Sequence, residues 1–134
     1  MRGAVQERGS ATFRWPLHPT SVRLSRGAVQ AMCAFWRTTE VCQSAVLAVS
    51  ELVGNSVRAG CGESVLLRLS WTTRRLRVEV HDQAPGLPEP TEAEPLAESG
   101  RGLWIIAQLA VRWGTLKQPL GKMVWAEIAL PGTA

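Results

Sequence analysis

The apolar residues of this chain change their spacing partway along the sequence, and that change restricts the possible folds more than any other feature. Within residues 39–58 they recur near helical spacing, as Val49, Val53 and Val57 illustrate, which predicts an amphipathic helix. Within residues 76–81 apolar and polar residues alternate instead, which predicts a strand with one face in the core. A chain with both periods has to pack helices against a sheet.

The remaining elements follow from the same patterns and from the turn residues between them. In chain order they are an edge strand at 11–17, a helix at 21–38, a strand at 64–71 paired with 76–81, a helix opened by 100–102 and ended by Gly114, and a hairpin of 115–117 with 123–130. This order predicts an α+β fold. We expect a two-layer α/β sandwich whose mixed, mostly antiparallel sheet carries about three helices on one face.

Two helix boundaries are predicted by local chemistry. The segment from Pro19 to Ser21 offers an N-cap for the first helix, and Gly60 and Gly62 end the second. The apolar face of the first helix is expected to hold Val22, Leu24, Ala28, Val29, Met32, Phe35 and Trp36.

Composition supports one packed domain, because hydrophobic residues make up 46% of the 134 residues and charged residues 19%. We expect residues 1–10 to be a disordered tail and residues 11–131 to be the domain. No apolar run approaches the ~18–20 residues of a membrane-spanning helix. The N-terminus has no apolar segment of the kind that secretory signals carry. We therefore expect no membrane association and a cytoplasmic location.

Charge and cysteine content exclude several other classes. Residues 1–39 hold six Arg and one Glu, a balance suited to an acidic partner or to nucleic acid. A basic run with interleaved aromatic residues is missing, so a solvated helix face is the favoured interpretation and no direct nucleic-acid contact is expected. The three Cys have no CxxC spacing and no His partner, so neither a disulfide framework nor a zinc site is indicated.

The chain has one Asn and one Asp, and both lie in apolar-periodic segments. Asn55 follows Glu51 by four residues, so the two side chains share one face of the second helix. A carboxylate there can accept the proton of a nucleophile. An Asn carbonyl oxygen suits Mg²⁺, which also keeps phosphate oxygens and waters. The alternative is an exposed polar stripe on an amphipathic helix.

Two further segments carry chemistry. Asp82 stands where a strand ends, and a carboxylate there can accept a hydrogen bond from the exocyclic amine of adenine, while Gly86 permits close backbone approach to a flat base. Gly100, Arg101 and Gly102 precede a helix, whose free N–H groups and dipole suit phosphate. The alternatives are a strand-ending turn and a flexible loop entering a helix.

Together these segments resemble the N, G1 and G2 boxes of the GHKL ATPases, which have the Bergerat or histidine-kinase-like fold. The resemblance covers roughly residues 20–130, and it is greatest to the anti-sigma-factor branch of stand-alone serine kinases. The tail GKMVWAEIAL and the helix RGLWIIAQLAVRWG strengthen that assignment. It implies that the chain binds ATP and Mg²⁺, binds a sigma factor and phosphorylates a serine of a small anti-anti-sigma partner. It also implies a homodimer through the sheet face or the first helix.

The resemblance assigns roles to individual residues. It implies that Asn55 binds Mg²⁺, that Glu51 acts on the attacking hydroxyl and that Asp82 reads adenine. Gly86 matches the second glycine of the G1 box, and Gly100 and Gly102 match the glycines of the G2 box, with Arg101 between them. Residues 83–99, with four Pro and four Glu, would be the ATP lid.

The chain departs from the family pattern at two places. Ala84 stands where the G1 pattern has its first glycine, and Ala59 stands where relatives often have His. Ala84 motivates a second hypothesis, a non-catalytic nucleotide-sensing module that switches partner affinity. A third hypothesis is a pure interaction domain whose pocket binds no nucleotide.

Overall fold

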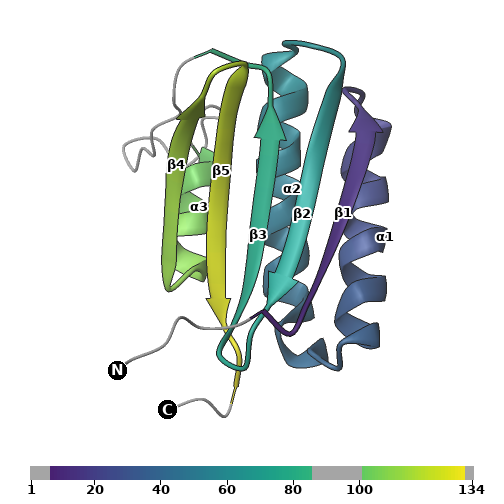
Figure 1. The fold of residues 1–134 in the computed structure, drawn as a ribbon, viewed down its shortest axis with the longest axis vertical. Coiled ribbons are helices and arrows are strands. Elements are labelled where there is room, and N and C mark those ends of the chain that lie inside the picture. The colour runs from purple at the N-terminus through teal and green to yellow at the C-terminus, as the bar shows by residue number, and fades with distance from the viewer. Residues whose placement is uncertain (1–6, 86–100, 132–134) are drawn as a thin grey trace.

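The computed structural model describes residues 7–85 and 101–131. Its elements are β1 (Gly9–Pro16), α1 (Thr20–Phe35), a short 3₁₀ helix (Thr39–Val41), α2 (Cys42–Ala59), β2 (Ser64–Trp71), β3 (Arg75–Asp82), α3 (Arg101–Leu109), β4 (Arg112–Gln118) and β5 (Gly121–Ala129). The strands form one layer and the three α-helices cover one face of it (Figure 1). The predicted α+β sandwich is therefore confirmed.

The sheet has the strand order β1-β2-β3-β5-β4, and every pair of described neighbours is antiparallel. The expectation of a mixed sheet is corrected on this point. Two hairpins, β2–β3 and β4–β5, form from neighbouring segments, and the β3–β5 pairing joins them. At one end of that joint Asp82 lies opposite Lys122.

The core lies between the sheet and the helices. The alternation in β3 puts Leu76, Val78 and Val80 into this layer, where none is more than 2% exposed. In α2, Val49 and Val53 are fully buried against them. The two periods seen in the sequence therefore describe the two sides of one core.

Helix α1 buries only part of the predicted face, since Val29 is buried and Val22, Met32 and Trp36 pack against the core. Its buried residues are Ser21, Ser25, Val29 and Cys33, whereas Leu24 is 46% exposed and Phe35 78%. The buried residues are spaced four apart and are small, so they allow α1 to lie close to α2. Apolar periodicity missed this face because two of its four residues are serines whose hydroxyls bond to backbone carbonyls, as Ser25 does to Ser21 at 2.6 Å.

The first turn of α1 is capped differently from the expectation. Pro19 is the N-cap residue and makes no side-chain cap bond. Instead the backbone N–H of Thr20 donates to Nδ1 of His18 at 3.1 Å. The end of α2 agrees with the prediction, since Gly60 caps it in the left-handed conformation at φ 63°.

The third helix ends earlier in the sequence than predicted. Helix α3 ends at Leu109, and Gly114 belongs to β4 rather than ending a helix. A Cβ at Gly114 would lie 2.9 Å from the indole of Trp125, its partner on β5. Because glycine has no side chain, β4 and β5 can pair with the indole ring lying against Gly114. At the other terminus β1 begins at Gly9, so residues 9 and 10 belong to the sheet rather than to the predicted tail.

Within the described ranges, none of the helices combines the length and the apolar character that crossing a membrane requires.

Candidate functional site

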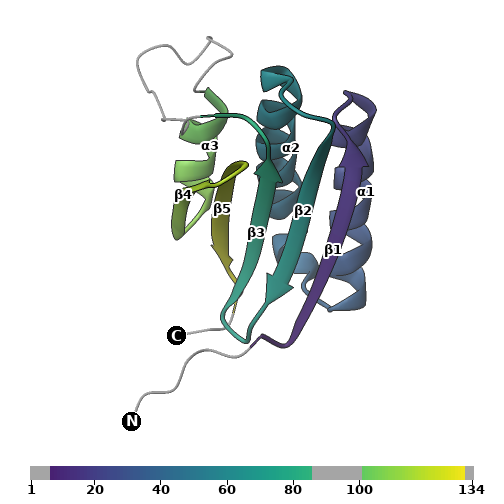
Figure 2. The same ribbon diagram turned by 45° about the horizontal axis from the view of Figure 1, so that its top comes forward.

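The predicted site segments meet at one end of the molecule. The C-terminal end of α2, the end of β3 and the beginning of α3 lie together there (Figures 1 and 2). Helix α2 packs against α3 and against strands β3 and β5. Side chains from α2, α3, β3 and β5, which are distant in sequence, can therefore face one region between the helices and this end of the sheet.

Asp82 is the most constrained side chain in this region. It is 4% exposed, and its Oδ1 accepts the backbone N–H of Ala84 at 2.9 Å. Its Oδ2 accepts the hydroxyl of Ser56 and an N–H of Lys122, the latter at 2.6 Å. A carboxylate has about four acceptor positions, and residues 7–85 and 101–131 supply donors to three of them. Within those ranges Asp82 is therefore a held, buried anion with one acceptor position on Oδ1 that has no donor.

Lys122 and Ser56 are site residues that sequence reasoning missed. Lys122 is the second residue of β5, and its side chain is 9% exposed and ion-paired with Asp82. Ser56 is buried in α2, one residue after Asn55. The available signal was the alternation in β5, which puts Lys122 on the same face as the buried Val124 and Ala126.

Asn55 and Glu51 occupy the partly exposed face of α2 beside this pair, as the i,i+4 spacing predicted. The side-chain oxygen of Asn55 accepts a hydrogen bond from Arg58, one turn later. The carboxylate of Glu51 makes no hydrogen bond or ion pair with any other residue that the structure describes. Its carboxylate is thus available to a substrate group.

The glycine segment is only partly visible. Gly86 and Gly100 lie outside the described residues, as does most of the segment 83–99. Arg101 and Gly102 are the first two residues of α3, so the predicted helix start is confirmed. Leu103 and Ile106, each at most 1% exposed, hold this nine-residue helix in the core. Its first N–H groups have no partner within the helix, the usual basis of anion affinity.

The residues present fit an adenine nucleotide and Mg²⁺ by their chemistry. Asp82 has an acceptor position that no described residue fills, as an exocyclic amine requires. Asn55 offers an oxygen ligand of the kind that Mg²⁺ prefers. Among the described residues no group of three or more His, Cys, Asp or Glu could hold a metal.

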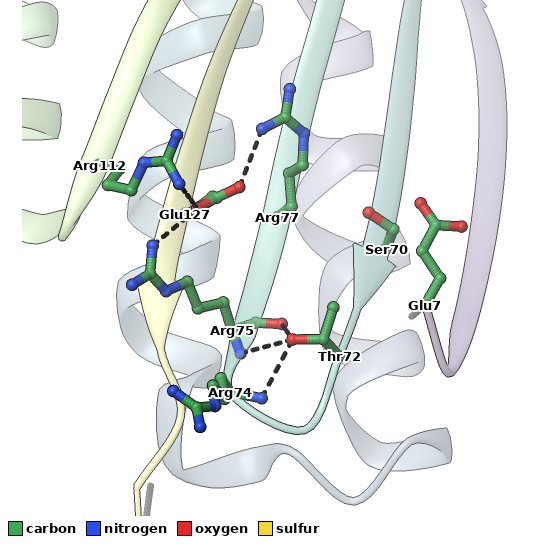
Figure 3. Close-up of a pocket in the computed structure, with 8 residues that line it drawn as sticks. All are labelled: Glu7, Ser70, Thr72, Arg74, Arg75, Arg77, Arg112 and Glu127. Atoms are coloured by element: carbon green, nitrogen blue, oxygen red, sulfur yellow. Dashed lines mark hydrogen bonds and ion pairs between the residues drawn. The ribbon is translucent and has the colours of Figure 1, made fainter. Parts of the chain in front are cut away.

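A separate hollow of about 340 Å³ lies on the sheet face away from the helices (Figure 3). Its centre is Glu127, which accepts hydrogen bonds from Arg75 and Arg77, each at 3.0 Å. Burial opposes ionisation there, yet these bonds and the charge of Arg112 lower the pKa of Glu127. The guanidinium of Arg77 also lies over the ring of Trp125, 4.4 Å from its centroid. Because these charged groups are paired with one another, we interpret them as an ion-pair network that stabilises the sheet, and we do not interpret the hollow as a ligand site.

One comparison with known proteins covers most of the chain. A family model described as a histidine kinase-like ATPase domain matches residues 15–128. That range runs from the end of β1 into β5 and includes Asp82, Lys122 and the polar residues of α2. No curated protein matches the chain significantly.

Proposed function

The chain belongs to the histidine kinase-like ATPase domain family, and on that premise we propose that it is a regulatory serine-protein kinase of the anti-sigma-factor type. Membership in the family implies that the domain binds ATP. The observation that carries the proposal is the buried carboxylate of Asp82, held at the end of β3 beneath α2. A buried carboxylate with an acceptor position that no described residue fills can accept a hydrogen bond from a donor on a ligand.

In this proposal each polar residue has one task. Asp82 accepts a hydrogen bond from the exocyclic amine of adenine, and Asn55 and nucleotide oxygens hold Mg²⁺, which would neutralise phosphate charge. Glu51 accepts the proton of the attacking serine hydroxyl. The N–H groups at the start of α3, with Gly100, Arg101 and Gly102, and the backbone at Gly86 cradle the nucleotide.

The proposed partners are a sigma factor and a small anti-anti-sigma protein that carries the acceptor serine. Support for a partner surface comes from α1, where Leu24 and Phe35 are 46% and 78% exposed. Large apolar side chains exposed on one helix are typical of interaction surfaces. The same helix would serve a homodimer, as the family resemblance implies.

A second candidate function is a nucleotide-sensing module that transfers no phosphate. The contact that favours it is the hydrogen bond from Arg58 to the side-chain oxygen of Asn55, since this oxygen is the proposed Mg²⁺ ligand. A protein that binds ATP without Mg²⁺ would need no change at that contact.

Calorimetric titration tests the shared part of both candidates. ATP is added to the wild type with and without Mg²⁺, and to Asn55→Ala, with Arg74→Ala on the opposite face as the control. We expect binding that Mg²⁺ strengthens in the wild type and in Arg74→Ala but not in Asn55→Ala. A wild type that binds no ATP under either condition would contradict both candidates.

Labelled ATP then separates the two candidates. Small proteins from the source cells are incubated with the wild type or with Glu51→Gln and γ-³²P-ATP. Phosphoserine that forms with the wild type and disappears with Glu51→Gln supports the kinase. Retained ATP binding with no phosphoserine supports the sensing module.

A further inference from the structure

We propose that Lys122 is a specificity-determining residue of the nucleotide site, where its ammonium group donates a hydrogen bond to N1 of the adenine ring. The inference rests on the proposed function, because it requires an adenine nucleotide beside Asp82. In this inference two side chains recognise the base, with Asp82 as the hydrogen-bond acceptor and Lys122 as the donor, instead of Asp82 alone.

The position of Lys122 is fixed by the backbone around it. Lys122 lies opposite Asp82 in the β3–β5 register, and both side chains face the helix side of the sheet. The preceding residue, Gly121, has φ 154°, and a Cβ there would lie 1.9 Å from the carbonyl oxygen of Asp82. This close approach, possible only for glycine, presses the start of β5 against the end of β3. The ammonium group is therefore held beside the carboxylate by the strands themselves.

The ammonium group has unused capacity. Its side chain is 9% exposed, and an ammonium carries three N–H donors. One of them reaches Oδ2 of Asp82 at 2.6 Å, and the other two have no acceptor among the residues that the structure describes. A buried charged donor without an acceptor is costly, so a ligand that supplies one gains affinity.

The edge of adenine offers the complementary pattern. Its exocyclic amine is a donor, and the neighbouring ring atom N1 is an acceptor. Among the described residues one acceptor position on Oδ1 of Asp82 has no donor, and Lys122 supplies donors close by. The amine therefore meets the carboxylate while N1 meets the ammonium. Guanine in the same orientation presents the reverse pattern, an acceptor at its 6-position and an N–H at N1, and is disfavoured at both contacts.

Two alternative roles for Lys122 predict different effects of ligand changes on binding. As a purely structural counter-ion of Asp82 it would be indifferent to changes in the base. As a phosphate ligand it would respond to the phosphates and not to the ring. The experiment therefore varies single atoms of the base.

The test compares two analogues in calorimetric titrations of the full wild-type chain. In 1-deaza-ATP a C–H replaces N1, and in 7-deaza-ATP, the matched control, a C–H replaces N7. We expect 7-deaza-ATP to bind within about threefold of ATP. We expect 1-deaza-ATP to bind about 10- to 100-fold more weakly, the usual effect of leaving a charged donor unpaired. Equal binding of ATP and 1-deaza-ATP would overturn the inference.

The variant Lys122→Met completes a double-mutant cycle in which the change in the base is combined with the loss of the ammonium group. Its melting curve first has to show that it folds. It should bind ATP more weakly than the wild type and should bind ATP and 1-deaza-ATP alike. A penalty for 1-deaza-ATP that persists undiminished in Lys122→Met would show that another group reads N1. A loss that affects ATP but leaves adenosine binding unchanged would place Lys122 on the phosphates, again against the inference.

The two levels of the proposal fail differently. If the wild type binds no ATP at all, the proposed function fails and the inference with it. If the wild type binds ATP but does not distinguish the analogues, only the role of Lys122 is refuted. Because the analogue comparison uses the wild type alone, it decides the question even where Lys122→Met does not fold.

Discussion

Replacing Asp82 with asparagine should destabilise the folded domain strongly, apart from any effect on nucleotide binding. The substitution keeps the size of the side chain and removes its charge. Lys122 is then left as a buried cation without its anion, with a side chain that is 9% exposed. An uncompensated buried charge is among the few single changes that cost several kcal/mol.

The magnitude follows from the geometry of the pair. At the observed separation of 2.6 Å the gross attraction is about 6 kcal/mol for an effective dielectric constant of about 20. Breaking one side of a buried pair typically costs ~3–5 kcal/mol. Domains of this kind have a total stability of about 5–15 kcal/mol. Asp82→Asn should therefore lose about a fifth or more of the free energy of unfolding.

Urea unfolding of four proteins measures this effect: the wild type, Asp82→Asn, Lys122→Met and the double variant. Removing both charges replaces the pair by neutral groups, which is often close to neutral for stability, so the double variant should recover most of the loss. A loss below ~1 kcal/mol in Asp82→Asn would refute the reasoning. So would a double variant no more stable than Asp82→Asn. The comparison also prevents a folding defect from being mistaken for lost ATP binding.

Two further predictions concern other regions of the fold. A hydrogen bond from His81, with help from Arg77 and against the effect of burial, lowers the pKa of Glu79 from 4.5 to about 2. Its contribution to stability is therefore present above pH 4.5 and lost as the pH falls toward 2, and Glu79→Gln should remove up to ~3 kcal/mol of that acid dependence in urea titrations between these pH values. Gly121→Ala should lower the free energy of unfolding in urea by ~2–5 kcal/mol, because the added Cβ would meet the backbone of Asp82. The control Gly27→Ala in α1 has nothing within 4 Å of the added Cβ and should be neutral or stabilising. Equal effects of the two substitutions would contradict the close-approach argument.

The sequence predicted the elements whose signal is local. The alternation in residues 76–81 and the helical spacing in residues 39–58 correspond to β3 and α2, and Gly60 ends α2 as expected. Asp82 was singled out because a lone aspartate at a strand end is unusual, and it is indeed buried there. These features depend on residues within a few positions of one another.

The missed features depend on distant residues. The contact of Lys122 with Asp82 spans 40 positions, and it exists because of a strand register that no local pattern specifies. The buried face of α1 was misjudged because Ser25 is apolar in effect only when its hydroxyl finds a carbonyl within its own helix. Helix α3 ends before Gly114, and this glycine instead pairs in β4 with Trp125, a residue on another strand. Tertiary packing decides each of these cases.

The pairing of β3 with β5, which joins the two hairpins, affects the rate at which the domain folds. Each hairpin closes a short loop and can form quickly, whereas β3 and β5 pair across tens of intervening residues. Long-range pairing of this kind slows folding, so we expect the β3–β5 joint to limit the rate. Asp82 and Lys122 come together only at that step. The candidate nucleotide site is therefore assembled with the completed sheet, and a ligand that bridges the two residues would slow unfolding at the same joint.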